Sequence, residues 1–260
     1  MDHETAAAYL RRIGLPGPAG APSLGLLREL HERHLSTVPF ENLGIHLDEA
    51  ITLDEAALVD KIVRRRRGGF CYELNGAFAA LLAALGFQVR RRAARVFGED
   101  GTLGIPFDHL ALVVELDGER WLADVGFGKH SRYPLRLDWP DAQDDPDGKF
   151  LVVDAPHGDV EVLRDGVPQY RMEQRPRELE EFEVGSWWQQ TSPASHFTQS
   201  LMCSLRTEDG RISISGDRLI TTVGDTRTET TLAGETEIFD VYRTIFGFEL
   251  DRLPVVRPRS

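Results

Sequence analysis

The sequence contains little cysteine and has no long hydrophobic run. Its two cysteines, Cys71 and Cys203, do not make a disulfide framework, and this usage favours a reducing cytosol. No stretch approaches the roughly 20 apolar residues that span a bilayer. The first residues, "MDHETAAAYLRRIG", lack the basic and apolar regions of a signal peptide. We therefore expect a cytoplasmic protein with no membrane partner.

Motifs for metals, nucleotides and nucleic acids are also missing. No Cys/His cluster has zinc spacing, so no metal is expected, and neither a G-x-G-x-x-G nor a Walker-type loop occurs. The formal charge of −12 argues against a nucleic-acid partner. The one strongly basic run is Arg64 to Arg67. We interpret its first three residues as a solvated helix end, where positive charge suits the helix dipole.

The 260 residues, 41% hydrophobic and 28% charged, can bury a sizeable core. Hydrophobic residues follow a helical period in the first part of the chain and alternate after it. We expect a helical segment, a β-rich middle and a smaller α/β tail, without internal repeats or long linkers. Predicted helices are 23–35 after a Ser23 cap, 52–67 with a Thr52/Glu55 capping box, Cys71 to Leu85, 175–189 and 234–246. Predicted strands are 87–98, 109–116, 120–127, 149–153, 158–163, 167–172, 201–206, 211–215, 218–222 and 226–231, and "DDPDG" (144–148) is expected to be a loop.

Cys71 lies where a loop is predicted to become a helix, immediately after "RRGGF". Unpaired N–H groups at a helix start favour a thiolate, which is the nucleophilic form of cysteine. A lone buried cysteine is more often a small hydrophobic residue. A catalytic role therefore requires a histidine and a carboxylate nearby.

A predicted hairpin selects His109 and Asp124 as these partners. With a two-residue turn at Asp117-Gly118, paired residue numbers sum to 235, so Asp124 lies opposite Ala111. His109 is two residues from Ala111, on the same face, as a diagonal neighbour of Asp124. A three-residue turn would destroy this pairing.

The other histidines fit less well. His31 and His34 are expected on a surface helix, His3 at the terminus, and His46, His130 and His157 in loops, which leaves His196 in "SPASHFTQ" as the rival. His109 could instead be a satisfied core histidine. An aspartate within the apolar "WLADVGF" nevertheless needs a buried partner, and His109 supplies one.

Five segments resemble the arylamine N-acetyltransferase family in order and spacing. They are "VPFENL" (38–43), "RGGFCYELN" (67–75), "HLALVV" (109–114), "DVGFG" (124–128) and "SPASHFTQSL" (192–201). The resemblance covers about residues 5 to 222. It implies an α+β fold with a papain/transglutaminase-like Cys-His-Asp core: a helical bundle (1–86) carrying the cysteine, a β-barrel-like domain (87–190) carrying the histidine and aspartate, and an α/β lid (191–260).

The resemblance further implies ping-pong acetyl transfer from acetyl-CoA, used as a co-substrate rather than a permanently bound cofactor, to a small aromatic amine or hydrazine. Cys71 would be the nucleophile, His109 the base and Asp124 the group that orients it. Glu41 and Arg67 match a buried pair that braces the cysteine loop. The substrate and coenzyme positions are Phe40, Phe127, Phe197, Gly126, Gly128 and Lys129. Taken alone, each phenylalanine could be core, and the glycines could mark a bend.

The sequence departs from the family pattern at two places. Asp108 precedes the histidine where a hydroxyl residue is common, and "KHSRYPLRL" (129–137) replaces a glycine- and threonine-containing loop. Lys129, Arg132 and Tyr133 would suit another acyl donor about as well as a coenzyme phosphate. One alternative is therefore an amide synthase that closes polyketide chains taken from an acyl carrier protein. Further alternatives are a hydrolase or transglutaminase-like enzyme with the same triad, or a non-catalytic binding module.

Overall fold

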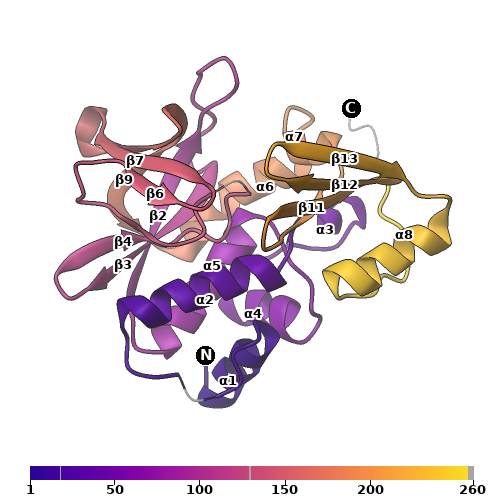
Figure 1. Cartoon of the computed structure of the whole chain (residues 1–260), viewed down its shortest axis with the longest axis horizontal. Coiled ribbons are helices and arrows are strands. Elements are labelled where there is room, and N and C mark those ends of the chain that lie inside the picture. Colours follow the sequence, from indigo (N-terminus) through magenta and orange to yellow (C-terminus); the bar gives the residue numbers. More distant parts are fainter. Residues whose placement is uncertain (18, 129, 257–260) are drawn as a thin grey trace.

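The computed structural model describes residues 1–17, 19–128 and 130–256. Two antiparallel sheets rest on a layer of helices, which is the α+β architecture expected from the sequence (Figure 1). In the described part of the chain, no helix combines the length and the apolar character that crossing a bilayer requires.

The helical layer is centred on α5, Cys71–Ala84, whose first twelve residues are all buried. Around it lie α1, His3–Arg12, α2, Leu24–Thr37, the short α3, Leu43–His46, and α4, Glu55–Val63. Ser23 caps α2 as predicted, because its side chain accepts a hydrogen bond from Leu26 N. The predicted helix from Cys71 is confirmed to within one residue. Its side chains are buried on every face because its neighbours enclose it.

The larger sheet has eight strands in the order β5-β4-β3-β2-β9-β8-β7-β6. Their bounds are β2 Gln88–Val96, β3 His109–Leu116, β4 Glu119–Leu122, β5 Leu135–Arg136, β6 Gln143–Asp145, β7 Gly148–Asp154, β8 Val160–Arg164 and β9 Val167–Arg177. The edge strands β5 and β6 approach each other, since the Gln143 side chain bonds to both N and O of Arg136. The sheet is therefore a nearly closed barrel around an apolar interior that includes Phe150 and Tyr170.

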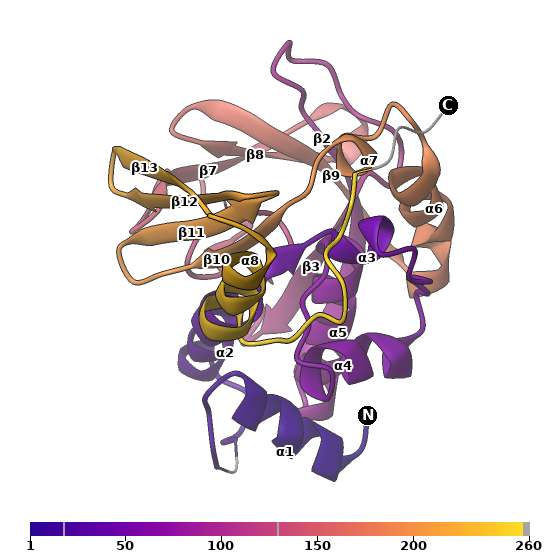
Figure 2. The same ribbon diagram turned by 90° about the vertical axis from the view of Figure 1, so that its right-hand side faces the viewer.

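The smaller sheet has the order β1-β10-β11-β12-β13. Strand β1, Phe40–Glu41, comes from the helical part of the chain, and the others are β10 Cys203–Arg206, β11 Gly210–Ser215, β12 Arg218–Val223 and β13 Thr226–Thr231. Helix α8, Glu235–Val241, continues as the π-helical turn η3, Tyr242–Phe246, and packs on this sheet. After it the chain returns past α3, where Val255 N bonds to the His46 carbonyl (Figure 2).

Several predicted elements are wrong in extent or kind. The second predicted helix spans Glu55–Val63 rather than 52–67, because the Asp54 carboxylate, rather than Thr52, caps it through Ala57 N. "DDPDG" is the turn of the β6–β7 hairpin rather than a free loop. The segment 175–189 begins as strand, and the 3-10 turn η2, Leu179–Phe182, and helix α6, Glu183–Thr191, follow it. The strand expected at 120–127 ends at Leu122.

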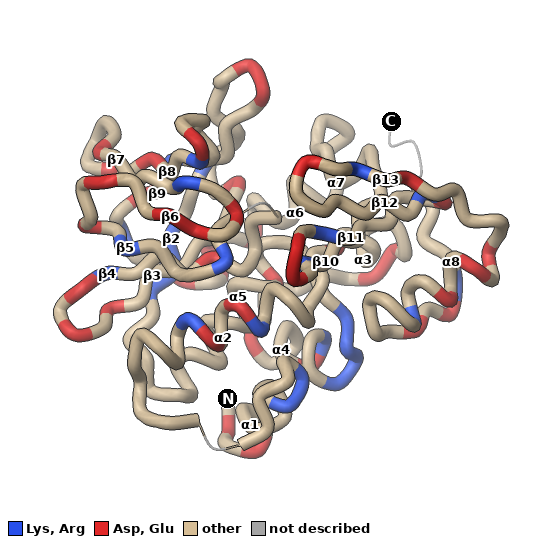
Figure 3. The backbone as a smooth tube through the Cα atoms, viewed as in Figure 1, with Lys and Arg blue, Asp and Glu red and all other residues tan. Residues whose placement is uncertain are grey.

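The histidine placement also needs correction. His31 and His34 are fully buried rather than on a surface helix, and they pack against Phe78 of α5. His46 and His130 are buried as well. The run Arg64 to Arg66, by contrast, is exposed beyond the end of α4, as expected (Figure 3).

Candidate active site

Cys71 is the first residue of α5, and the preceding glycines allow its loop to lie against the chain at residues 39–41. A Cβ on Gly68 would come 1.8 Å from the carbonyl oxygen of Pro39, so no larger residue fits there. Glu41 N donates to the Gly69 carbonyl over 2.9 Å. The thiol is thereby fixed at a helix N-terminus, where the helix dipole favours negative charge.

A buried ionic cluster braces this loop from behind. Arg67 contacts Glu41 through Nε at 3.0 Å and Nη2 at 2.9 Å, which is the predicted pair. Lys61 lies 2.6 Å from Glu73 and 3.9 Å from Glu41. Lys61 and Glu73 were not anticipated from the sequence. Burial alone would raise the pKa of Glu41, but the charges of Lys61 and Arg67 outweigh it and hold that pKa below its ordinary value.

His109 and Asp124 meet as the hairpin prediction requires. Asp117 and Gly118 form a two-residue turn with positive φ at both residues, and Leu116 pairs with Glu119. The β3–β4 ladder ends at Leu122. Beyond it, His109 Nε2 lies 2.7 Å from Asp124 Oδ2, with both side chains buried. This bond uses Nε2 and leaves Nδ1 of the imidazole without a bond to Asp124, and His109 and Cys71 line the same cavity.

The electrostatics favour a protonated imidazole beside an ionised carboxylate. Burial opposes a charge on His109, but Asp124 and Cys71 together outweigh it and raise the pKa of His109 to about 10. Burial likewise opposes ionisation of Asp124, yet the His109 charge and hydrogen bond hold the pKa of Asp124 far below its ordinary value. His109 can therefore hold a proton and return it.

Asp124 accepts three further hydrogen bonds that sequence reasoning missed. Its Oδ1 accepts from Asn75 Nδ2 at 2.8 Å and from Gly126 N at 3.0 Å, while Oδ2 accepts from the Tyr170 hydroxyl at 3.1 Å. Tyr170 in turn contacts His130 Nε2 at 3.0 Å. Asn75 lies one helical turn after Cys71, so it was detectable from its position. Tyr170 comes from β9, and nothing in the local sequence marks it.

A cavity of about 540 Å³ opens in front of Cys71 and His109. It is lined mainly by apolar and glycine residues from the 96–105 loop, the 126–128 segment and the α6–α7 region, where α7 is His196–Gln199. A concave, mostly apolar pocket beside a candidate nucleophile is typical of a small-molecule site. Within the described residues, no group of three His, Cys, Asp or Glu side chains is placed to hold a metal ion.

The structure brings most predicted pocket residues to this cavity. Phe40, Phe127 and Phe197 line it, together with Gly126 and Gly128. A Cβ on Gly126 would come 2.8 Å from Cys71 Cα, so this glycine allows the Asp124 segment to pack on α5, whereas Gly128 faces open space. The rival histidine, His196, is exposed at the pocket wall. Lys129 lies outside the described residues.

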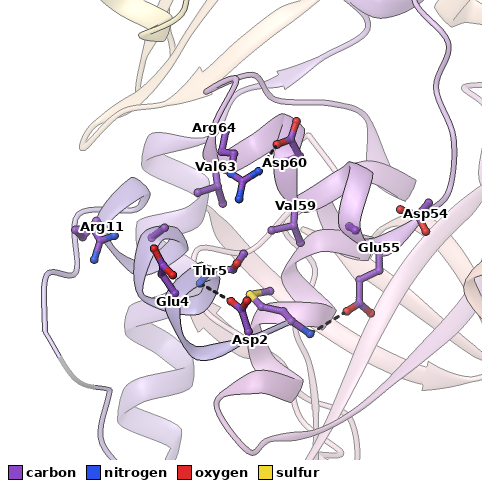
Figure 4. A pocket seen from close by; sticks show the side chains of 13 residues that line it. Asp2, Glu4, Thr5, Arg11, Asp54, Glu55, Val59, Asp60, Val63 and Arg64 are labelled. Atoms are coloured by element: carbon purple, nitrogen blue, oxygen red, sulfur yellow. Dashed lines mark hydrogen bonds and ion pairs between the residues drawn. The ribbon is translucent and has the colours of Figure 1, made fainter.

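A second cavity, of about 600 Å³, lies between α1 and α4 (Figure 4). Its lining is polar and includes Asp2, Glu55 and Asp60, and it contains none of Cys71, His109 and Asp124. The larger volume therefore does not mark the catalytic centre.

A thiol at a helix start, an imidazole bound to a buried carboxylate and an apolar pocket beside them are the groups that a cysteine-dependent acyl-transfer enzyme uses. The N-acetyltransferase family model matches residues 23–255. The chain is 34% identical to an arylamine N-acetyltransferase of Mycolicibacterium smegmatis over 257 residues, which cover 94% of this chain and 92% of that protein. It is 36% identical to the Escherichia coli enzyme of the same name, over 80% of this chain and 75% of that protein.

Solved structures give the same result. The M. smegmatis arylamine N-acetyltransferase superposes with a TM-score of 0.86 at 33% identity, over 96% of this chain and 93% of that one. The Salmonella typhimurium enzyme superposes with a TM-score of 0.88 at 28% identity, over 97% and 94%. The chain belongs to the arylamine N-acetyltransferase family and is an acyltransferase.

Proposed function

We propose that this protein transfers an acetyl group from acetyl-CoA to arylamines and arylhydrazines through an acetyl-Cys71 intermediate. The observation that carries the proposal is the buried His109–Asp124 pair, whose imidazole lines the same apolar cavity as Cys71. The names of the relatives reported above support this substrate class. They do not favour the amide-synthase alternative.

The first half-reaction loads the enzyme. The Cys71 sulfur, with its proton on His109, attacks the thioester carbonyl carbon of acetyl-CoA. A new carbon–sulfur bond to Cys71 forms as the bond to the coenzyme sulfur breaks. His109 returns the proton to the departing coenzyme thiolate, so free coenzyme A leaves and acetyl-Cys71 remains.

The second half-reaction transfers the acetyl group. The amine nitrogen attacks the acetyl-Cys71 carbonyl, the bond to the Cys71 sulfur breaks, and His109 accepts the proton that the nitrogen loses. The amide product leaves, and the resting Cys71–His109 pair is restored. The aromatic side chains Phe40, Phe127 and Phe197 would hold the acceptor ring. Because both half-reactions use one site, coenzyme A must leave before the amine reacts.

The test is to mix the protein with acetyl-CoA and a hydrazine and to follow free thiol. Steady release that requires the hydrazine, with one acetyl group on Cys71 by mass spectrometry, is expected. Release that continues without an acceptor would indicate a hydrolase instead. Turnover that requires a carrier-bound acyl chain would favour the amide synthase.

Cys71→Ser is the matching variant, because a hydroxyl is far harder to ionise than a thiol. It should lose turnover by more than about a thousandfold while the protein stays folded. Cys203→Ala is the control: Cys203 is fully buried in β10, and burial raises the pKa of its thiol well above the ordinary value. Normal activity of Cys71→Ser would refute the assignment of the nucleophile.

Three further expectations remain proposals. The catalytic roles of Cys71, His109 and Asp124 rest on geometry. The division of the chain at about residues 86 and 190 rests on the change from helices to the larger sheet and then to the smaller sheet, and β1 of the first segment crosses it by pairing with β10. A cytoplasmic location rests on the sparing use of cysteine, and both cysteines are free.

A further inference from the structure

Asp108 places a carboxylate in the wall of the otherwise mostly apolar pocket. It lies next to His109 in sequence and is among the residues that line the cavity. The two residues that donate hydrogen bonds to its carboxylate, Gln189 and Val96, line the same cavity, and so does Gly104, on which an added Cβ would meet the carboxylate. The carboxylate is therefore part of the wall that a bound acceptor meets, rather than a group on the outer surface.

The position of this carboxylate is fixed from two sides. Gln189 Nε2 donates to Oδ1 over 2.6 Å, and Val96 N donates to Oδ2 over 3.3 Å. The Gln189 amide cannot turn away, because its Oε1 accepts from the Ser195 hydroxyl over 2.6 Å. Ser195 also caps α7 through Phe197 N, so the chain of hydrogen bonds ties Asp108 to the pocket wall that carries Phe197.

The carboxylate is not neutralised by a partner. Among the described residues, no ion pair includes Asp108. Burial raises the pKa of its carboxyl above the ordinary value, while the hydrogen bonds from Val96 and Gln189 and the charges of His109 and Arg95 act to keep it ionised. Arg95 directs its Nε to the Gly104 carbonyl instead, at 2.8 Å. An ionised carboxylate has room for about four hydrogen bonds, and Asp108 receives one on each oxygen. It can therefore accept from a ligand without losing a partner.

We propose that Asp108 is a specificity-determining residue that favours acceptors bearing a second, positively charged or hydrogen-bond-donating group on the aromatic ring, and disfavours acceptors bearing a carboxylate. The inference rests on the proposed function, because it concerns the acceptor of that reaction. Its physical basis is that a fixed negative charge in a poorly solvated wall attracts a cation and repels an anion more strongly than it would in water.

Three isosteric amines test this directly. 4-Aminobenzamidine, 4-aminobenzamide and 4-aminobenzoate have nearly the same shape and carry charges of +1, 0 and −1 away from the reacting nitrogen. These substituents also change the nucleophilicity of the amine. The informative quantity is therefore the ratio of kcat/KM for the amidine to kcat/KM for the benzoate. When this ratio is compared between two enzyme variants, the intrinsic reactivities of the amines cancel.

In Asp108→Asn this ratio should fall by about tenfold or more relative to the wild type, with the neutral amide changing least. Glu99→Gln is the matched control, because Glu99 is exposed on the 96–105 loop, is not among the residues that line the cavity, and loses the same charge. It should leave the ratio unchanged. A merely structural role for Asp108 would lower all three rates in proportion, and an unchanged ratio in Asp108→Asn would overturn the inference.

A binding measurement on the wild-type protein tests the role of Asp108 separately from the proposed acetyl transfer. Each amine is added without acetyl-CoA, and protection of Cys71 from iodoacetamide is measured. The amidine should protect Cys71 at about tenfold lower concentration than the benzoate does. A higher salt concentration should reduce this difference between the two protecting concentrations. Equal protection by both would count against Asp108. Failure to acetylate even the neutral amide, with this order of protection intact, would count against the acetyl transfer alone.

Discussion

At the scale of single residues, Asp124 organises the site. Its carboxylate has no contact with solvent and accepts four hydrogen bonds, from His109, Tyr170, Asn75 and the backbone of Gly126. A buried charge is tolerated only when its hydrogen-bonding capacity is filled, and here it is filled on every side. The carboxylate therefore holds the imidazole in one orientation and one tautomer.

Asp124→Asn tests this role. An amide cannot supply the negative charge, and it can present N–H where His109 needs an acceptor, so we expect at least a hundredfold loss of kcat. Alkylation of Cys71 at neutral pH should slow in parallel. Tyr170→Phe is the milder comparison, because it removes one of four hydrogen bonds, worth about 1 kcal/mol, and should cost less than about tenfold. Equal losses of kcat in the two variants would contradict the view that the negative charge of Asp124 is its main contribution to catalysis.

At the scale of elements, the start of α5 is held in place by the segment 39–41 and by a buried ionic cluster. Gly68 and Gly69 press against residues 39–41, and Glu41, Arg67, Lys61 and Glu73 occupy the space behind. On the other side, the Tyr72 hydroxyl donates to the Phe107 carbonyl over 2.7 Å. Phe107 has φ +59°, which is rare for an aromatic residue, and it directly precedes Asp108 and His109. The cysteine helix and the histidine strand are thus joined at their reactive ends.

Arg67→Met should destabilise the protein by about 3–5 kcal/mol, because it leaves the buried Glu41 carboxylate without its main partner. Urea denaturation gives the free energy of unfolding. The double variant Arg67→Met/Glu41→Leu should recover part of this loss, since neither charge then remains to be compensated. Additive losses would indicate that the two side chains contribute independently, contrary to their contact.

At the scale of the whole molecule, polar contacts join the barrel to the smaller sheet around the pocket. Arg206 of β10 contacts Asp147 in the β6–β7 turn, Arg211 of β11 donates to the Gly128 carbonyl, and Arg132 donates to the Glu208 carbonyl. The chain on both sides of residue 129 is therefore fixed against the smaller sheet. Both sheets contribute to the lining of the pocket, through Phe40 of β1 and His109 of β3.

Arg206→Met should lower the free energy of unfolding by about 1–3 kcal/mol, because Asp147 then loses the partner of a largely desolvated carboxylate. Arg218→Met is the matched control within the same sheet. Its partner Glu229 is 37% exposed and Arg218 is 54% exposed, so a change below about 1 kcal/mol is expected. Similar changes in the free energy of unfolding of the two variants would show that the Arg206–Asp147 contact between the sheets stabilises the protein no more than an exposed ion pair does.

The pH dependence of stability also belongs to the whole molecule. Folding raises the pKa of His109 from 6.5 to about 10. The contribution of protonated His109 to the free energy of unfolding is therefore complete at pH values just below 6.5 and is lost as the pH rises towards 10. The stability difference between the wild type and Asp124→Asn should therefore shrink across that window. Thermal unfolding at a series of pH values measures it. A difference independent of pH would mean that the pair is not a protonated imidazole beside a carboxylate.

Much of the site could be predicted from the sequence because it depends on local geometry. The glycines before Cys71 and the two-residue turn at Asp117-Gly118 fix a helix start and a strand register, and strand register decides which side chains share a face. The register brings the two strands together up to Leu122, and Asp124 follows two residues later on the side of His109. Element ends were predicted less well, since the cap of α4 depends on which of two neighbouring polar side chains meets the helix.

The sequence by itself thus determined the nucleophile candidate, its two partners and the succession of helices and strands, and its resemblance to the family implied the Glu41–Arg67 pair. Tertiary structure alone decided that Tyr170 completes the shell of Asp124, that Lys61 and Glu73 join the bracing cluster, and that His31 and His34 are buried. It also decided that the Asp108 carboxylate joins the wall of the pocket. The physical reason is that these contacts link segments far apart in the chain, and such contacts leave no periodic trace in the local sequence.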